Sequence, residues 1–564
     1  MSSASNPKER LVGLAKEYWA ERMANEPINA TALGDRRFDD KLPDISPEGR
    51  ARIKEQYREV LSRVNVIDEG GLAEADRLTR TALIVDASSN LDYYSCDLED
   101  WVVDPLQGFQ NEFMDLESYQ PVRSFVEAEA MVKRWRAIGR YIDQQIANLR
   151  SGEKDGRVSV AAAVEKVIDE LRDLVAKEEV DWPLLRPLSI RHDDWNEEQR
   201  RSFADGLRAA VSESAKPGFM RYLEFLRSEL IVGARPQERP GIMHISRGAQ
   251  TYAKLIRVHT SLDLTPAELH QTGLNEVARI NREMEMLGEK VFGIRDRREV
   301  LKKLRNDRSV YFSSRDEVAA KAESALARAN ASISKFFGRL PKTPCEVVRM
   351  EPHEEKHSTI AYYRPPAADG SRPGRYYINT SEPETRPRYE AEALAYHEAV
   401  PGHHLQIAIA QELEGVPEFR KNSGVTAFIE GWGLYSERLA DEMGLYSSDL
   451  DRIGILSYDS WRACRLVVDT GMHAMGWTRS QAIDFMFDNS ALAMNNIVNE
   501  IDRYITWPGQ ALAYKTGQLE IMRLRQAATA RLGTSFDIRR FHDSLLCNGA
   551  LPLKALRHVM ETYA

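Results

Sequence analysis

A cluster of histidines and one glutamate is the part of this sequence best suited to chemistry. His397, Glu398, His403 and His404 lie within eight residues of an otherwise apolar segment, Ala395–Gln406. Three imidazoles and a carboxylate are costly to bury unless something compensates them, and a bound metal ion is a common compensation. The cluster therefore favours a metal-dependent hydrolase.

The spacing in this cluster leaves two histidines as alternatives for the second metal ligand. On a regular α-helix His404 would share the face of His397 but lie about 10 Å further along the axis. His403 would need a distorted helix. We expect that distortion at Pro401-Gly402, because proline removes a backbone donor and clashes with the preceding turn. The competing interpretation is a kinked core helix whose histidines bond to backbone carbonyls.

A literal His-Glu-x-x-His string also occurs, from His353 to His357, and we rank it lower. A zinc-binding helix of this kind needs an apolar back face. Here the intervening residues include Glu355 and Lys356, Pro352 precedes the string, and strand-like sequence surrounds it. We expect a solvated loop, with a histidine pointing into the active cleft as the alternative.

Glu430 is the expected third ligand. A catalytic zinc takes three protein ligands and an open position. Glu430 lies 33 residues after His397 and precedes two glycines, which would let the backbone approach a neighbour closely. Glu437, seven residues further on, lies on the same helix face. It would either orient a ligand histidine or pair with Arg438 or Arg462.

Polar side chains further along the chain are candidates for binding substrate. Around a Pro-Gly turn the sequence places the donors Arg503, Tyr504, Gln510, Tyr514 and Lys515. Acyl transfer needs donors where the oxyanion develops, and a substrate carboxylate needs a cation. We expect Tyr514 and Arg503 to act in catalysis and the other three to bind substrate. The alternative is an ordinary capped helix with surface charges.

Two further histidines complete the candidate set. His404, if it is not a metal ligand, would help to stabilise the oxyanion. His473 lies one turn after Asp469 and is a candidate for substrate binding. A lone helical histidine is more often a core residue whose nitrogens are satisfied within the fold, and that is the alternative for His473.

Composition predicts an ordinary soluble protein. The chain has 564 residues, 43% hydrophobic and 29% charged, with a formal net charge of −9. No basic stripe suggests nucleic acid as a partner. The N-terminus has no apolar signal-peptide core, and no apolar run reaches the ~18–20 residues of a membrane span. We therefore expect a cytoplasmic protein without membrane contact. The four cysteines lie far apart, which predicts free thiols.

Hydrophobic periodicity predicts a mostly α-helical fold with one small sheet just before the histidine cluster. Two or three strands are expected between about 343 and 381, where β-branched and aromatic residues alternate with turns. We expect one large domain over residues 1–564, or two lobes of about 1–340 and 341–564. The predicted helices are 7–25, 47–66, 75–96, 126–150, 157–177, 196–229, 247–259, 265–289 and 315–337.

Several long motifs resemble a bacterial family catalogued as domain of unknown function 885. They are HEAVPGHHLQ, FIEGWGLYSERL, RLVVDTGMHAMGW and RYITWPGQALAYKTGQLEI, joined by NATALGD and TPAELHQTGLNEVARI, so the resemblance spans almost the entire chain. The family is similar to helical gluzincin peptidases such as angiotensin-converting enzyme, thimet oligopeptidase and carboxypeptidase Taq. This implies two helical lobes around a deep groove. It also implies His397, His403 and Glu430 as zinc ligands, and Glu398 as general base.

The expected function is zinc-dependent hydrolysis of amide or peptide bonds, by a carboxypeptidase or oligopeptidase of small substrates. The alternatives are a metal-dependent amidase acting on a small non-peptide amide and a non-catalytic helical binding protein. Two histidines and a carboxylate also suit non-haem iron oxygenases, but the helical pattern argues against their jelly-roll fold. The expected partner is a small peptide or amide substrate, and a homodimer is allowed.

Overall fold

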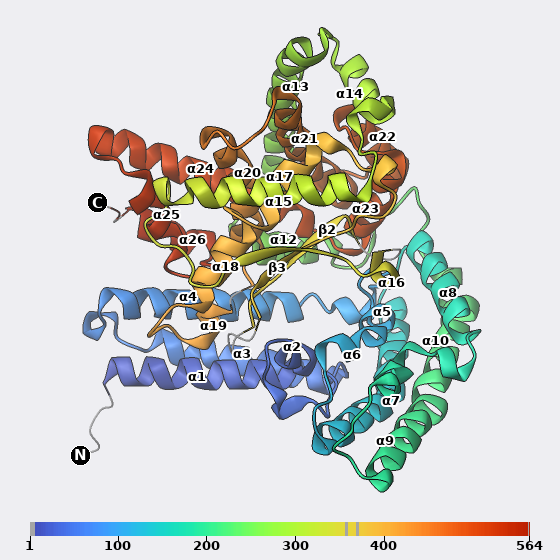
Figure 1. The fold of residues 1–564 in the computed structure, drawn as a ribbon. Helices are drawn as coiled ribbons and strands as arrows, with labels where there is room; N and C mark the ends of the chain where they lie inside the picture. Colours follow the sequence, from blue (N-terminus) through green and yellow to red (C-terminus); the bar gives the residue numbers. More distant parts are fainter. Residues whose placement is uncertain (1–5, 356–358, 368–371, 423, 562, 564) are drawn as a thin grey trace. The chain divides into compact units, whose positions relative to one another are not determined.

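Helices carry most of the chain, as the periodicity predicts (Figure 1). The computed structural model describes residues 6–355, 359–367, 372–422, 424–561 and 563, without the side chains of 353 and 354. Predicted helix 265–289 is α13 (Pro266–Phe292), which begins with a capping box. The Thr265 hydroxyl accepts from the Glu268 N–H while the Glu268 carboxylate accepts from the Thr265 N–H.

The chain divides into two compact units. Unit 1 is Met1–Asp68 with Asn90–Thr251, and unit 2 is Glu69–Ser89 with Tyr252–Ala564. The division differs from the lobe boundary that we expected near residue 340. The reason is that the strand-rich segment after that point packs against helices on both sides of it in the sequence, so all of them belong to unit 2.

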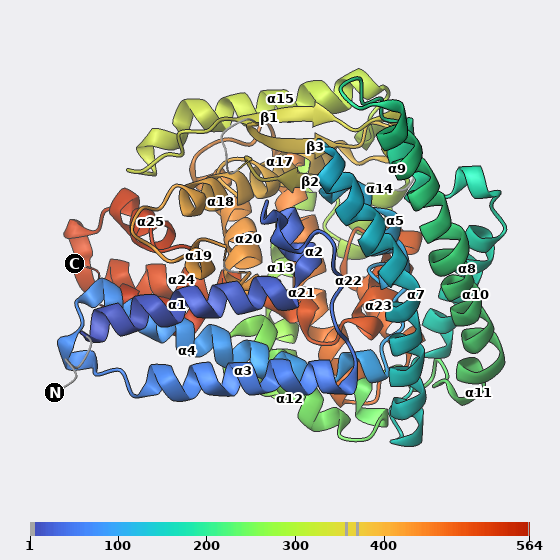
Figure 2. The ribbon, with the colours of Figure 1, turned by 90° about the horizontal axis from the view of Figure 1, so that it is seen from below.

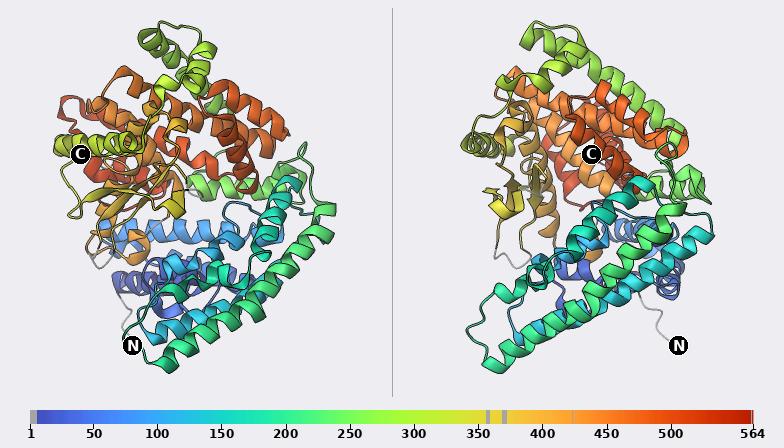
Figure 3. Two further views of the ribbon diagram at one scale, coloured as in Figure 1. Left: turned by 45° about the vertical axis from the view of Figure 1, so that its right-hand side comes forward. Right: turned by 90° about the vertical axis from the view of Figure 1, so that its right-hand side faces the viewer.

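Unit 1 is built around the long helix α7 (Phe125–Lys154). Met131, Trp135, Ile138 and Ile142 form a buried stripe at helical spacing along it. Figure 3 shows the teal and green helices of this unit lying side by side. These are α8 (Ala161–Val175), α9 (Glu197–Ala210) and α10 (Lys216–Phe225). The remaining helices are α1 (Pro7–Asn25), α2 (Pro27–Ala32), α3 (Pro47–Asn65), α5 (Phe109–Met114), α6 (Leu116–Tyr119) and α11 (Ile231–Gly233).

Unit 2 contains the predicted small sheet. Its strands are β1 (Cys345–Arg349), β2 (Ala361–Arg364) and β3 (Gly374–Ile378). β3 lies in the middle, parallel to β1 and antiparallel to β2. Figure 2 shows the sheet next to α15 (Arg315–Ser332) and α17 (Ala391–Glu398), which contact β1 and β2 respectively. The sheet thus lies directly beside the first helix of the histidine cluster.

The centre of unit 2 is a group of packed helices: α18 (His403–Gln411), α20 (Thr426–Glu442), α21 (Asp449–Ala474) and α24 (Ala513–Leu532). α20 and α24 touch where two glycines meet. A Cβ on Gly431 would lie 2.5 Å from the Gly517 Cα, so neither position has room for a side chain. This confirms the predicted close approach of the backbone after Glu430.

The remaining helices surround this centre or link the units. They are α4 (Glu74–Tyr94), α12 (Gly248–Thr260), α14 (Arg297–Asn306), α16 (Pro352–Glu355), α19 (Glu418–Lys421), α22 (Arg479–Asn489), α23 (Met494–Thr506), α25 (Ile538–Leu546) and α26 (Leu553–Glu561). Among the described helices, none combines the length and apolar character that a membrane span requires. None of the four cysteines, all of them among the described residues, is joined in a disulfide, as predicted.

Candidate metal centre

The histidine cluster spans two helices rather than one distorted helix. α17 ends at Glu398, α18 begins at His403, and the turn between them contains a cis peptide bond before Pro401. Gly402 is required in this turn, because a Cβ there would lie 1.9 Å from the carbonyl oxygen of His397. The turn brings the two imidazoles together with their ring centroids 4.7 Å apart.

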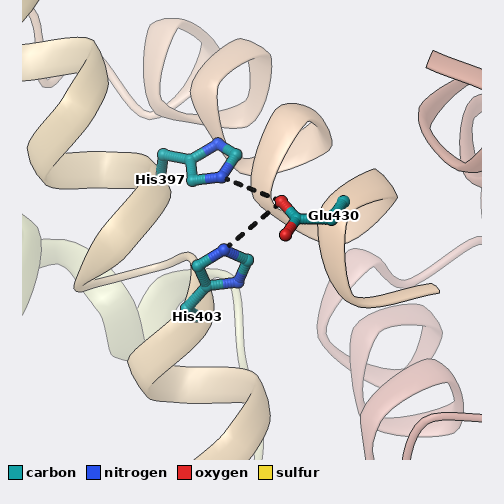
Figure 4. A group of neighbouring side chains, drawn as sticks. All are labelled: His397, His403 and Glu430. Atoms are coloured by element: carbon teal, nitrogen blue, oxygen red, sulfur yellow. Dashed lines mark ion pairs between the residues drawn. The ribbon is translucent and has the colours of Figure 1, made fainter. Parts of the chain in front are cut away.

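Three predicted ligands converge in the space beside this turn. Their ligand atoms, from His397, His403 and Glu430, all lie within 4.8 Å of one another. Figure 4 shows the Glu430 carboxylate pointing between the two rings, at 3.5 Å from Nε2 of His397 and 3.6 Å from Nε2 of His403. Two ligands about 2.1 Å from a tetrahedral zinc lie about 3.4 Å apart. The donor set therefore fits a zinc ion.

One face of α20 supports His397. Glu430, Gly433 and Glu437 follow one another at helical spacing along this face. The imidazole of His397 lies directly on Gly433, where a Cβ would be 2.6 Å from the ring Cε1. Its Nδ1 bonds to the Glu437 carboxylate at 2.8 Å, which turns Nε2 toward Glu430. A carboxylate behind a ligand histidine fixes its tautomer and orientation.

A neighbouring face of α20 fixes the turn that carries His403. The indole N–H of Trp432 donates to the carbonyl of Pro401 at 2.9 Å, and the hydroxyl of Ser436 donates to the same carbonyl at 3.3 Å. Trp432 is fully buried. The turn is thereby fixed to the helix that also carries Glu430, so one element sets the position of all three predicted ligands.

His397, His403 and Glu430 together favour the presence of a positive charge between them. Burial alone would lower the pKa of His397, but the carboxylates of Glu430 and Glu437 raise it to about 9. Burial alone would raise the pKa of Glu430, but His397 and His403 hold it well below its usual value. A proton on an imidazole or a metal ion between the ligands would satisfy this arrangement.

Glu398 ends α17 next to the predicted ligand His397. Burial raises its pKa, against the opposing effect of the two neighbouring histidines His403 and His397. In the described part of the chain its carboxylate has no hydrogen-bond partner. It is therefore available to exchange a proton with a bound molecule.

His404 is bonded to residues outside this centre, and the geometry does not support its expected role at the oxyanion. Its Nδ1 bonds to the hydroxyl of Tyr363 on β2 at 2.9 Å, and its Nε2 bonds to the carbonyl of Thr343 at 3.1 Å. Burial lowers its pKa to about 4. Both nitrogens are used within the fold, which matches the backbone-bonded alternative considered above for this one histidine.

Tyr504 is also occupied within the fold. Its hydroxyl donates to Glu500 at 2.5 Å and accepts from Arg465 at 2.7 Å and from the Trp461 indole at 3.1 Å. It is 1% exposed. No hydrogen-bonding capacity is left for substrate, so the geometry does not support its expected role in substrate binding.

Arg503 and Gln510 lie beside this network and Tyr514 lies at its edge. Arg503 donates to Gln510 at 3.2 Å and to Glu500 at 3.0 Å. The ring of Tyr514 lies against the guanidinium of Arg465, 4.3 Å from its Cζ. The hydroxyl of Tyr514 bonds to none of the described residues, and it stays a candidate for the oxyanion.

Lys515 and His473 have structural roles. Lys515 is fully buried, and its ammonium bonds to Asp459, to Glu276 at 2.9 Å and to Gln518 at 2.8 Å. His473 bonds through Nε2 to the carbonyl of Tyr504 at 3.0 Å. The geometry supports substrate binding by neither residue. For Lys515 the reason is that its three donors already have partners.

The literal His-Glu-x-x-His string does not form a solvated loop throughout. Its first part belongs to the short helix α16, and Glu355 is buried, where it accepts from Arg315 and from the hydroxyl of Thr380. His357 lies outside the described residues.

Three residues near the centre were not among the predicted candidates: Arg462, Arg465 and Glu500. The two arginines are three positions apart in a mostly apolar stretch of α21, from Ile453 to Val468, that also contains Asp459. Charged residues within such a helix are a signal that sequence inspection could have used, because charges are rarely buried without a partner or a function.

Fold and site together define a mostly helical protein with a two-histidine, one-carboxylate centre. The chain belongs to the family described as bacterial protein of unknown function (DUF885), whose model matches residues 27–560. This confirms the resemblance seen in the motifs. No curated protein matches the chain.

Two solved structures share this fold. One is described as "the putative lipoprotein from Colwellia psychrerythraea", at 26% identity and a TM-score of 0.91, with 99% of each chain covered. The other, "a putative lipoprotein of unknown function from Shewanella oneidensis", has 17% identity and a TM-score of 0.77, with 98% of this chain and 99% of that chain covered.

Proposed function

We propose that this protein is a zinc-dependent hydrolase of amide or peptide bonds, related in mechanism to the helical gluzincin peptidases. The observation that carries the proposal is the convergence of His397, His403 and Glu430 at the spacing of a tetrahedral zinc site. Glu437 behind His397 supports it, because such a carboxylate is typical of catalytic zinc sites.

In this mechanism His397, His403 and Glu430 hold the zinc. The chemistry supplied by bound zinc is Lewis-acid activation of a water molecule and of the scissile carbonyl. Glu398 takes the proton of the attacking water and delivers it to the leaving amine, a contribution of about 10²–10⁴-fold. Tyr514 is the side chain we assign to the oxyanion, since its hydroxyl is not used within the described fold.

The substrates we propose are short peptides, cleaved by carboxypeptidase or oligopeptidase action. A small non-peptide amide is the alternative substrate, and comparing acyl-amino acids with a peptide library distinguishes the two. A non-catalytic helical binding protein is the alternative from another class. A cytoplasmic location stays a prediction.

Elemental analysis combined with turnover tests this proposal. We expect about one zinc per chain in the wild type and in Glu398→Gln, with peptide hydrolysis lowered about 10²–10⁴-fold in the variant. His403→Ala should empty the site, whereas His404→Ala should keep its zinc, because His404 bonds to Tyr363 and Thr343 instead. Full activity of Glu398→Gln, or equal zinc loss in both histidine variants, would contradict the proposal.

A further inference from the structure

Two buried arginines of α21 have guanidinium nitrogens without partners. Arg462 is 5% exposed and Arg465 3% exposed. Within the described residues Arg462 forms neither a hydrogen bond nor an ion pair, and its Nε and Nη1 are buried. Nη1 of Arg465 is likewise buried and unpartnered. A buried cation without a partner is costly, so a group that the fold does not supply is expected to complete this site.

Aromatic rings hold the two arginines, here called the arginine pair, in place. Cζ of Arg462 lies 4.1 Å from the ring centroid of Trp461 and 4.5 Å from that of Tyr458. Cζ of Arg465 lies 4.5 Å from the Trp461 ring and 4.3 Å from the Tyr514 ring. Stacking on a ring face occupies the plane of a guanidinium but leaves its N–H edge free. That edge matches the two oxygens of a carboxylate.

The nearby carboxylates do not neutralise the pair. Glu500 accepts hydrogen bonds from both Arg465 and Arg503, each at 3.0 Å. Burial alone would raise the pKa of Glu500, but these two arginines lower it to about 2, so it is ionised and already shared. Burial raises the pKa of Glu390 to about 7 despite the influence of Arg462, so this carboxyl is a poor counterion at neutral pH.

Helix α21, which carries the arginine pair, packs against helices of the metal centre. α21 packs against α17, whose last residue is Glu398. The charge of Arg462 also acts on Glu398, where it opposes the effect of burial on the pKa. Tyr514, against Arg465, lies one helical turn before Gly517, which touches the backbone next to Glu430. A molecule at the centre is therefore within the electrostatic reach of the pair.

We propose that Arg462 and Arg465 bind a carboxylate of the substrate beside the metal centre. The proposal rests on the proposed function for the reaction, but the anion site itself is independent of turnover. The arginine pair suits a carboxylate better than the cations Lys515 and Arg503 do, because Lys515 is paired elsewhere and Arg503 is shared with Glu500 and Gln510. The carboxylate would come from a peptide C-terminus or from an acidic side chain.

The test compares three acetylated tripeptides: one with a free C-terminal carboxylate, its C-terminal amide, and an amide that ends in aspartate. The wild type should prefer the free acid or the aspartate amide over the neutral amide. For the preferred peptide Arg462→Gln should lower kcat/KM about 10–100-fold, the effect of losing a charge-assisted hydrogen bond. For the neutral amide it should change little. Arg462→Lys, which keeps the positive charge but not the paired N–H groups of the guanidinium, should recover part of the lost kcat/KM.

Arg452→Gln is the matched control. Arg452 lies on the same helix but pairs at the surface with Asp441 and Asp449, so its loss should leave the peptide preference unchanged. All variants are compared by thermal unfolding, and only those that unfold cooperatively are used. If Arg462→Gln does not unfold cooperatively, Arg462→Lys alone tests the proposal. It should lower kcat/KM for the charged peptide by a smaller factor and leave kcat/KM for the neutral amide unchanged.

Calorimetric binding separates this proposal from the zinc chemistry. If the protein holds no zinc and cleaves no peptide, the proposed function fails. The anion site still stands if the metal-free wild type binds a charged peptide more tightly than the neutral amide and Arg462→Gln removes that difference. Equal affinity of the wild type for all three peptides, or an equal loss for charged and neutral peptides in the variant, would overturn it.

Discussion

Helix α21 carries two groups of buried charges that are compensated in opposite ways. At one of them Asp459 accepts from Lys515, Arg438 and Arg279, and these cations also pair with Glu276 and Glu283; this is here called the Asp459 cluster. It contains three cations and three carboxylates. One turn further along lies the arginine pair, Arg462 and Arg465. Among the described residues it has a single bonded carboxylate, Glu500, which pairs with Arg465 and not with Arg462.

The contrast distinguishes the buried charges of the Asp459 cluster, which hold the fold together, from those of the arginine pair, for which we propose a ligand. In the Asp459 cluster the cations bring α13, α20 and α24 onto α21, and each finds its partner within the protein. In the arginine pair, N–H groups are left over next to the proposed catalytic centre. When most buried charges of a fold have partners, those that lack them are expected at functional sites.

The largest effect should follow from removing the central charge of the Asp459 cluster. Asp459→Asn leaves three cations around a neutral amide, and breaking a buried ion pair from one side typically costs ~3–5 kcal/mol. Urea unfolding should show a loss of that size, with KM unchanged for any substrate. Asp441→Asn, which breaks a surface pair with Arg452, is the control and should cost no more than ~1 kcal/mol. Similar losses of unfolding free energy in Asp459→Asn and Asp441→Asn would argue against a structural role for the Asp459 cluster.

Glu437→Gln should affect the metal centre and leave the arginine pair intact. The amide is a weaker acceptor for Nδ1 of His397, and loss of such a supporting carboxylate typically lowers metal affinity about 10–100-fold. Competition with a chelator measures this. Arg462→Gln should bind zinc like the wild type. Zinc affinity that falls in Arg462→Gln but not in Glu437→Gln would reverse the assignment.

Arg462→Met should stabilise the protein slightly. The substitution replaces a buried, unpaired cation by an apolar side chain of similar length, and we expect the free energy of unfolding to rise by about 1 kcal/mol. Denaturant unfolding of the ligand-free protein measures the change. A loss of several kcal/mol would place Arg462 with the structural charges and weaken its proposed role in binding.

Asp469 offers a smaller, pH-dependent comparison on the same helix. Burial raises its pKa to about 7, although the Tyr252 hydroxyl and the Gly509 N–H both donate to its carboxylate. A carboxyl whose pKa is raised on folding contributes stability below its unfolded pKa and loses it as pH rises through the folded value.

Asp469→Asn does not titrate, so the stability of the wild type relative to it should fall by about 1–2 kcal/mol from about pH 6 to about pH 7.5. Urea unfolding at the two pH values measures this. Asp193→Asn, at an exposed position, is the control. A relative stability that rises with pH would contradict the prediction.

The helices and the small sheet could be predicted from sequence because their signals are local. Periodicity fixes α1 and α13 almost to the residue, and the two glycines after Glu430 indicate the close packing that the structure confirms. His403 could be separated from His404 only in three dimensions, since the choice depends on the conformation of the turn at Pro401.

The roles of distant charged residues could not be predicted in the same way. Lys515 and Arg462 look equivalent in sequence, as cations in amphipathic helices near the candidate motifs. They differ in the number of carboxylates that other helices bring to each, and those carboxylates lie far away in the chain. Lys515 pairs with Glu276 and Asp459, whereas Arg462 has no bonded partner among the described residues. The boundary between the units was missed because no change of composition marks it.

Helix α20 provides the proposed ligand Glu430, the surface under His397, the carboxylate behind that imidazole and the donors that fix the turn at Pro401. The centre is therefore assembled as one piece. Its parts cannot vary independently during evolution. A change at Trp432 and a change at Glu437 disturb the same imidazole arrangement from two sides, so their costs should not add. Relatives are then expected to keep this whole helix or to lose the centre altogether.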